Sequence, residues 1–138
     1  MAKKLIRKTV DRNQWRQYFN VAEENYLGAM TNYDFELWTS AGILFVHSAI
    51  AYTDSLTIKA GSVKSSGEDH MQVVELVKQV ISISRADNIA LNRLVKILIE
   101  KSKVAYGGKI YSKKQVDSIK KNLERYRTWI VNKIEVIV

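Results

Sequence analysis

The sequence predicts an all-α fold, an up-and-down bundle of four to five helices. Apolar residues recur at spacings of three and four along five long segments, as they do on the buried face of a helix. The chain of 138 residues has no proline, which would break a helix interior. No segment alternates apolar and polar residues as a strand does, except the short Ile134–Val138. The length suits one core, so we expect residues 1–138 to form one domain.

The first helix is expected from about Asp11 to Met30, with Gly28 near its end. Its apolar side chains follow one another at steps of three and four residues, which places them on one face. These side chains are Trp15, Phe19, Ala22, Tyr26 and Met30.

The second helix is expected from about Tyr33 to Ala60. Asn32 or Asp34 can cap its start, because a short side-chain oxygen accepts an orphan backbone N–H. Gly61 fits a C-terminal stop. Leu37–Thr53 contains no Asp, Glu, Lys or Arg, but it is slightly short for a membrane span. We therefore expect no membrane segment and interpret this helix as the buried centre of the bundle.

A polar hinge, Gly61–Gly67, separates the second helix from the third and is expected to be the most mobile loop. The third helix is predicted from about Glu68 to Ile83. The fourth is predicted from about Arg85 to Ala105, capped by Ser84 and ended by Gly107–Gly108.

The fifth helix is predicted from about Lys113 to Val136, with Ser112 as its cap. It has the clearest apolar stripe of the chain, and the strength of this stripe favours a dimer. The stripe comprises Val116, Ile119, Leu123, Tyr126, Ile130 and Ile134.

Composition restricts the function. The chain has no cysteine, which excludes disulfides, thiolate metal sites and thiol nucleophiles. No secretory signal is visible, so the expected compartment is the cytoplasm. The net charge is +8 and is uneven: Met1–Arg16 carries +5, Gln17–Glu100 carries −4 and Lys101–Val138 carries +7. Basic ends favour an anionic partner, nucleic acid first, although a positive surface that only keeps the protein soluble is the alternative.

Two stretches together resemble a known family. The first is His47-Ser-Ala-Ile-Ala-Tyr-Thr-Asp54, followed by the polar hinge and Gly67-Glu-Asp-His70. The second is Leu94–Leu98, then Lys103-Val-Ala-Tyr106-Gly-Gly, then a helix carrying Glu124, Arg125 and Trp129. This order resembles small prokaryotic HEPN-type proteins (higher eukaryotes and prokaryotes nucleotide-binding), over about Asp34 to Trp129.

The resemblance implies a bundle of four or five helices, often a homodimer. It also implies a role in RNA metabolism, toxin–antitoxin pairs or defence, in some members beside a small nucleotidyltransferase. Ribonuclease members carry Arg, four to six residues, then His. That motif is absent here. Gly42, Ala41 and Ser40 stand five to seven positions before His47, and Ser65, Lys64 and Val63 stand before His70. No catalytic residue can therefore be carried over.

Weak candidates for chemistry are His47, Asp54 and His70. His47 and Asp54 lie seven residues apart on one helix face, a rise of about 10 Å, too far for direct contact in a straight helix. With His70 they would form a possible metal site if the hinge folds tightly. The alternative is that each satisfies a neighbour in the bundle. We expect no metal and no cofactor.

The best RNA-contact hypothesis is a group of basic residues around the Gly107–Gly108 turn and along the fifth helix. Lysines would neutralise phosphates, and a tyrosine would stack on a base. The alternative is a solvated helix face with the tyrosine packed inward. The candidates are Lys103, Tyr106, Lys109, Lys113, Lys114, Arg125 and Arg127.

These observations lead to three hypotheses. The first is a non-catalytic HEPN-like module, dimeric, that binds RNA or a protein partner such as a nucleotidyltransferase. The second is a metal-dependent ribonuclease or nucleotide-processing enzyme that uses the two histidines and Asp54. The third is a structural protein that assembles a larger complex.

Overall fold

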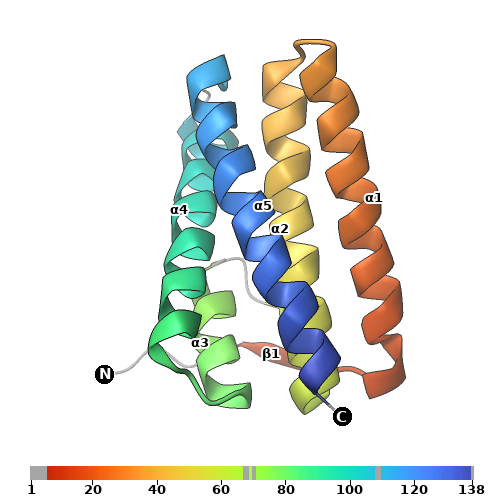
Figure 1. Cartoon of the computed structure of the whole chain (residues 1–138). Coiled ribbons are helices and arrows are strands. Elements are labelled where there is room, and N and C mark those ends of the chain that lie inside the picture. The colour runs from red at the N-terminus through yellow and green to blue at the C-terminus, as the bar shows by residue number, and fades with distance from the viewer. Residues whose placement is uncertain (1–5, 67–68, 70, 108–109, 138) are drawn as a thin grey trace.

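In a computed structural model, residues 6–66, 69, 71–107 and 110–137 are described, with the backbone alone for residues 102–107. Within these residues the protein is an all-α bundle, which confirms the predicted fold class. The helices are α1 (Trp15–Asp34), α2 (Trp38–Gly61), α3 (Met71–Val80), α4 (Arg85–Gly107) and α5 (Lys113–Val136). Figure 1 shows the long helices running alternately up and down, with the short helix α3 beside them.

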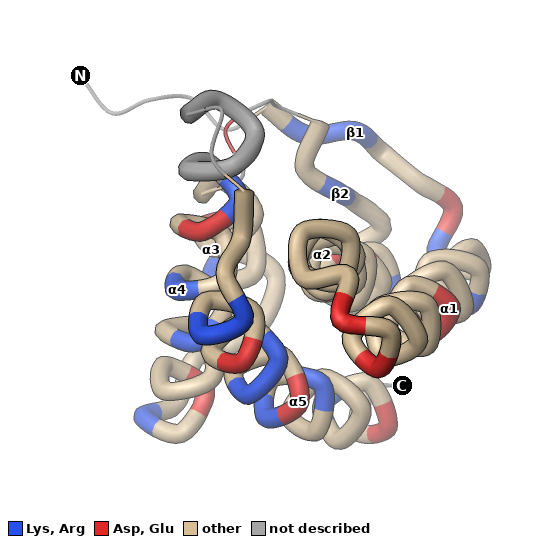
Figure 2. Tube along the Cα trace, turned by 90° about the horizontal axis from the view of Figure 1, so that it is seen from above, with Lys and Arg blue, Asp and Glu red and all other residues tan. Residues whose placement is uncertain are grey.

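Helix α2 lies at the centre of the bundle. Seen from above, it is surrounded by α1, α5, α3 and a pair of strands (Figure 2). Its length and composition would allow it to cross a membrane, but 78% of its apolar window is buried among the other helices. Phe45, Tyr52 and Leu56 are among its fully buried side chains. The prediction of a buried central helix is therefore confirmed.

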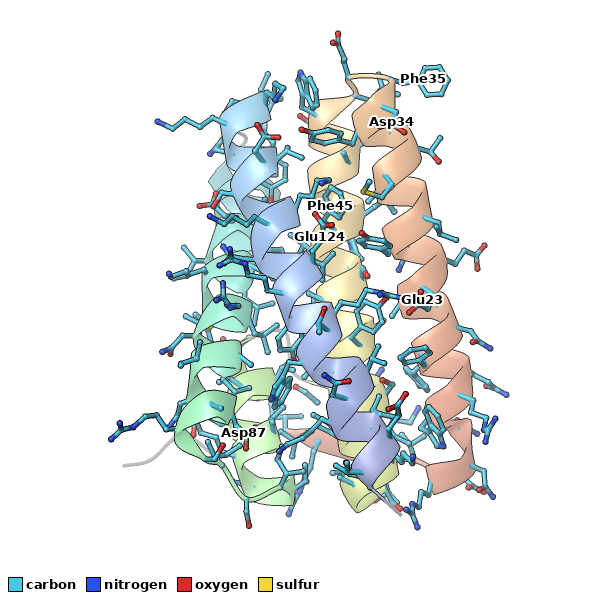
Figure 3. All side chains as sticks on the ribbon, in the orientation of Figure 1. Glu23, Asp34, Phe35, Phe45, Asp87 and Glu124 are labelled. Atoms are coloured by element: carbon cyan, nitrogen blue, oxygen red, sulfur yellow. The ribbon has the colours of Figure 1, made fainter. Side chains whose placement is uncertain are left out.

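The turn between α1 and α2 differs from the expectation. Helix α1 continues to Asp34, and Leu37 precedes α2 without a side-chain cap, so neither Asn32 nor Asp34 caps α2. The rings of Tyr33 and Trp38 pack edge to face, 5.1 Å apart. Tyr33 is helical in this contact, because α1 ends about one turn later than predicted. Glu36 makes the reversal with φ of 61°, and Phe35 points away from the bundle (Figure 3).

A two-stranded antiparallel sheet, absent from the prediction, joins the N-terminal segment to the segment after α2. Strand β1 (Arg7–Thr9) pairs with β2 (Val63–Ser65), with Lys8 opposite Lys64. Residues Val63–Ser65 of the predicted hinge are therefore a strand held by backbone hydrogen bonds. Each strand has only three residues, too few for alternation to be recognised in the sequence.

Helix α2 ends at Gly61, one residue beyond the predicted end at Ala60. Ser62, not Gly61, adopts the left-handed conformation there, with φ of 55°. Gly61 is needed for space, because a Cβ atom on it would lie 2.9 Å from Val80 of α3. The short α3 also begins later and ends earlier than predicted.

The predictions for α4 and α5 agree better with the structure. Ser84 Oγ accepts a hydrogen bond from the Asp87 backbone N–H, and Ser112 Oγ accepts one from Gln115, so both predicted caps are confirmed. The predicted bounds of α5 are also confirmed. Its six buried side chains are the six of the predicted stripe.

A buried carboxylate joins α5 to the start of α4. Asp87 accepts hydrogen bonds from the Ser84 backbone, Trp129 Nε1 (2.9 Å) and Lys133 Nζ. Burial opposes ionisation of this carboxyl, but the donors outweigh it and hold its pKa well below the usual range. Asp87 therefore stabilises the bundle as an anion.

Candidate nucleic-acid interface

Helix α5 carries two stripes of basic side chains that face different ways. Lys113, Lys120 and Arg127 follow one another at seven-residue steps, which places them on one side of the helix. This inner stripe faces α1. All three side chains are engaged there by acidic and aromatic groups.

The first two residues of the inner stripe lie over aromatic rings of the α1–α2 region. Lys113 Nζ is 5.8 Å from the Tyr33 ring centre and 5.6 Å from that of Trp38, and it bonds Asp117 at 2.8 Å. Lys120 Nζ is 5.4 Å from the Tyr33 ring and bonds Glu124 at 2.8 Å. Ring faces attract cations, so these lysines hold α5 against α1.

Arg127 is the most constrained member of the inner stripe. Its Nη2 donates to both carboxylate oxygens of Glu23 on α1, at 2.8 and 2.9 Å. Its Nε donates to the Tyr52 hydroxyl of α2 at 2.8 Å, and its guanidinium lies 5.4 Å from the Tyr26 ring centre. Hydrogen bonding to Glu23 raises the pKa of Arg127 further. Figure 3 shows Glu23 and Glu124 at this seam between α1 and α5.

The outer stripe of α5 consists of Lys114, Lys121 and Arg125, all exposed. Its members lie at steps of seven and four residues, so they share the face turned away from the bundle. No ion pair joins them to an acidic side chain in the described part of the chain. Their charges are therefore available to a ligand in solvent.

Helix α4 extends this basic surface. Arg85 and Lys96 are exposed and Arg93 is half-buried. A shallow groove of about 190 Å³ lies between the two helices. It is lined by Lys96 and Glu100 of α4 and by Ser118 and Asn122 of α5. We call the outer stripe of α5, together with Arg85, Arg93 and Lys96, the α4–α5 basic face.

The net charge is concentrated in these two helices. Helix α4 has five Lys or Arg and two Asp or Glu, and α5 has seven and three, so the pair carries +7. Helices α1, α2 and α3 together have three basic and five acidic residues, which gives −2. Figure 2 shows the basic positions crowding α4 and α5. The molecule therefore has a positive side, which attracts polyanions.

The structure divides the basic residues that the sequence grouped together. Lys114 and Arg125 lie on the α4–α5 basic face, whereas Lys113 and Arg127 belong to the inner stripe. The side chains of Lys103, Tyr106 and Lys109 lie outside the described residues. Lys121 and the three α4 residues were not among the sequence candidates, although seven-residue spacing from Lys114 would have identified Lys121.

The candidates for catalysis are in contrasting environments. His47 is exposed on α2, and partial desolvation, then the charge of Lys101, lower its pKa. Asp54 is buried on the same face, because β2 covers it: Lys64 Nζ lies 3.8 Å from its carboxylate and 5.0 Å from the Tyr18 ring centre. Burial raises the pKa of Asp54 to about 7, against the opposing effect of Lys64. His70 lies outside the described residues.

Among the residues that the structure describes, no three His, Cys, Asp or Glu side chains are grouped so that they would hold a metal ion.

Comparison with known proteins adds no family assignment, because no family model, curated protein or solved structure matches the chain.

Proposed function

We propose that the protein is a non-catalytic, HEPN-like helical module that binds RNA through the α4–α5 basic face. The observation that carries the proposal is the exposed outer stripe of α5, whose three cations have no acidic partner among the described residues. The cations of the inner stripe, by contrast, are engaged by acidic and aromatic groups.

The chemistry of this face suits the phosphate backbone. Its cations are interspersed with small polar side chains such as Ser118, Asn122 and Thr128. The described aromatic residues of α5 are turned elsewhere: Tyr126 is fully buried, and Trp129 stacks on it and bonds Asp87. Contacts to phosphates would therefore dominate over base stacking, with affinity that falls steeply as salt rises.

The absence of catalysis in this proposal rests on two observations. The Arg-x(4–6)-His pattern of the ribonuclease members is missing from the sequence. His47 is exposed, whereas Asp54 is buried beneath β2 beside Lys64, so the pair does not share one environment. The alternative, a metal-dependent ribonuclease or nucleotide-processing enzyme, keeps His47 and His70 as the residues to replace.

The experiment is incubation of the purified protein with end-labelled RNA, with and without a divalent metal ion, on native and denaturing gels. The proposal predicts a salt-sensitive shift on the native gel and intact RNA on the denaturing gel. Metal-dependent cleavage lost in His47→Ala would support the enzyme instead. Absence of both shift and cleavage would reject RNA binding and favour a protein partner, such as a nucleotidyltransferase.

Homodimerisation remains a separate prediction. The α4–α5 basic face would repel its own copy, so a dimer would have to use another surface. Phe35 and Leu37, which are 74% and 53% exposed at the α1–α2 turn, offer apolar area away from the basic face. Light scattering of the purified chain measures the mass directly, and a monomer at all concentrations would reject the prediction.

A further inference from the structure

A pocket of about 350 Å³ opens between the start of α1 and the end of α5, on the opposite side of α5 from helix α4. It lies beyond the Arg127–Glu23 pair, toward the end of α5, and no side-chain hydrogen bond or ion pair joins α1 to α5 at the pocket among the residues that the structure describes. Its volume is near the lower end for small-molecule sites. One compact ligand would fill it.

The walls of the pocket are aromatic and aliphatic. Trp15 and Phe19 of α1 lie edge to face, with ring centres 6.2 Å apart, and Val131 and Ile134 of α5 form the opposite wall. An edge-to-face pair presents a ring face beside a ring edge, which suits a flat aromatic group inserted against it.

One cationic side chain lines the rim of the pocket. Arg16 lines it, with its guanidinium 5.2 Å from the Trp15 ring centre. Lys59 Nζ lies on the same ring at 4.6 Å and donates to the Ile134 carbonyl at 2.7 Å. Burial, and then the charges of Arg12 and Arg16, lower the pKa of Lys59, which means that these cations are close enough to repel one another.

One acidic side chain limits the charge of the ligand. Glu135 is exposed at the same rim and would oppose a dianion such as a phosphate monoester more than a single carboxylate. From these contacts we propose that the pocket binds an aromatic monocarboxylate, with its ring between Phe19 and Val131 and its carboxylate on Arg16. This site is independent of the RNA-binding face.

The test uses three probes with the same ring: 2-naphthoate, neutral 2-naphthamide and 2-naphthyl phosphate. Titrations are followed by the indole N–H signals of ¹⁵N-labelled protein. Naphthoate should shift the Trp15 signal saturably. The signals of Trp38, at the far end of α2, and of Trp129, bonded to Asp87, should stay in place. Naphthamide should bind about tenfold more weakly than naphthoate, because it cannot form the ion pair with Arg16. Naphthyl phosphate should also bind about tenfold more weakly, because its second negative charge is repelled by Glu135.

Two variants distinguish the contribution of the ligand's aromatic ring to binding from that of its carboxylate charge. Arg16→Gln should weaken naphthoate about tenfold and leave naphthamide unchanged, whereas Lys78→Gln, which removes an exposed charge on α3, should change neither. Val131→Trp should fill the pocket and abolish both. Equal affinity for naphthoate and naphthamide, tighter binding of the phosphate, or no saturable shift of Trp15 would each overturn the proposal.

Discussion

Arg125 and Arg127 lie two positions apart on α5 and point to opposite sides of it. Arg127 is held by both carboxylate oxygens of Glu23 and by the Tyr52 hydroxyl, whereas Arg125 is exposed and has no acidic partner in the described part of the chain. The difference follows from the helix period, because two residues rotate the side chain by about 200°. One arginine therefore stabilises the bundle, and the other is available to a ligand.

Arg127→Met is expected to lower the free energy of unfolding by about 1–3 kcal/mol. The substitution keeps much of the aliphatic volume but removes the donor to Tyr52, whose side chain is fully buried, and the partner of Glu23. Urea denaturation measures the difference. Arg125→Met is the matched control, and it should change stability by less than about 0.5 kcal/mol.

The effects of the two arginine variants on RNA affinity should be the reverse of their effects on stability. Arg125→Met should weaken it, whereas folded Arg127→Met should bind RNA as the unchanged protein does. A loss of RNA affinity in Arg127→Met without a loss of stability would place Arg127 in the interface and contradict this assignment.

Gly42→Ala is expected to destabilise the protein by about 2–4 kcal/mol, because the new methyl group would lie 2.4 Å from the Tyr111 ring. That ring has little freedom to move: its hydroxyl donates to the Glu100 carbonyl at 2.9 Å, and its backbone N–H donates to Thr39 Oγ1. Thermal unfolding measures the change.

Gly28→Ala provides the matched comparison on α1. Its methyl group would make an ordinary contact of 3.4 Å with Leu44, in the interior of a helix where alanine is preferred over glycine. It should stabilise the protein by up to about 1 kcal/mol. Equal effects of the two substitutions would show that the Tyr111 contact is not tight.

The parts of the fold that could be predicted are those that depend on residues close together in the sequence. The stripe of α5 and the caps Ser84 and Ser112 depend on neighbours within a few residues, and all were predicted. The sheet between β1 and β2 depends on residues more than fifty positions apart and could not be seen locally. The end of α1 was misplaced because neither Asn32 nor Asp34 caps α2: helix α1 continues through both, and Tyr33 packs on Trp38 across the turn.

Asp54 should give the protein a distinctive pH dependence. Its pKa is raised to about 7 in the folded protein from an ordinary value of 3.8, so between these pH values the folded state holds a proton that the unfolded chain has lost. The contribution of Asp54 to the free energy of unfolding therefore falls as pH rises from about 4 to 7, and it is level above that.

Comparison with Asp54→Asn isolates this contribution. His47, whose lowered pKa acts in the opposite direction in part of this range, is present in both proteins and cancels. The variant should gain stability relative to the unchanged protein as pH rises from 4 to 7, as measured by urea denaturation at each pH. A difference that is constant with pH would show that Asp54 is ionised throughout.

The candidate interface could be predicted only in part from the sequence. Net charge and the basic C-terminal region were evident, and Lys114 and Arg125 were identified. Whether a given cation is already paired depends on tertiary contacts, such as Glu23 with Arg127, which are 104 positions apart. The basic residues of α4 were missed because their closeness to α5 is a property of packing.

The most direct test of the RNA-binding face compares two triple variants that each lower the net charge from +8 to +2. Lys114→Glu, Lys121→Glu and Arg125→Glu reverse the outer stripe. Arg7→Glu, Lys8→Glu and Lys78→Glu reverse exposed charges elsewhere. Affinity for labelled RNA is measured by fluorescence anisotropy at constant salt. We expect a loss of affinity of roughly a hundredfold or more for the first triple and of less than about threefold for the second. Equal losses, or RNA binding unchanged in the first triple, would contradict the assignment of RNA binding to the α4–α5 basic face.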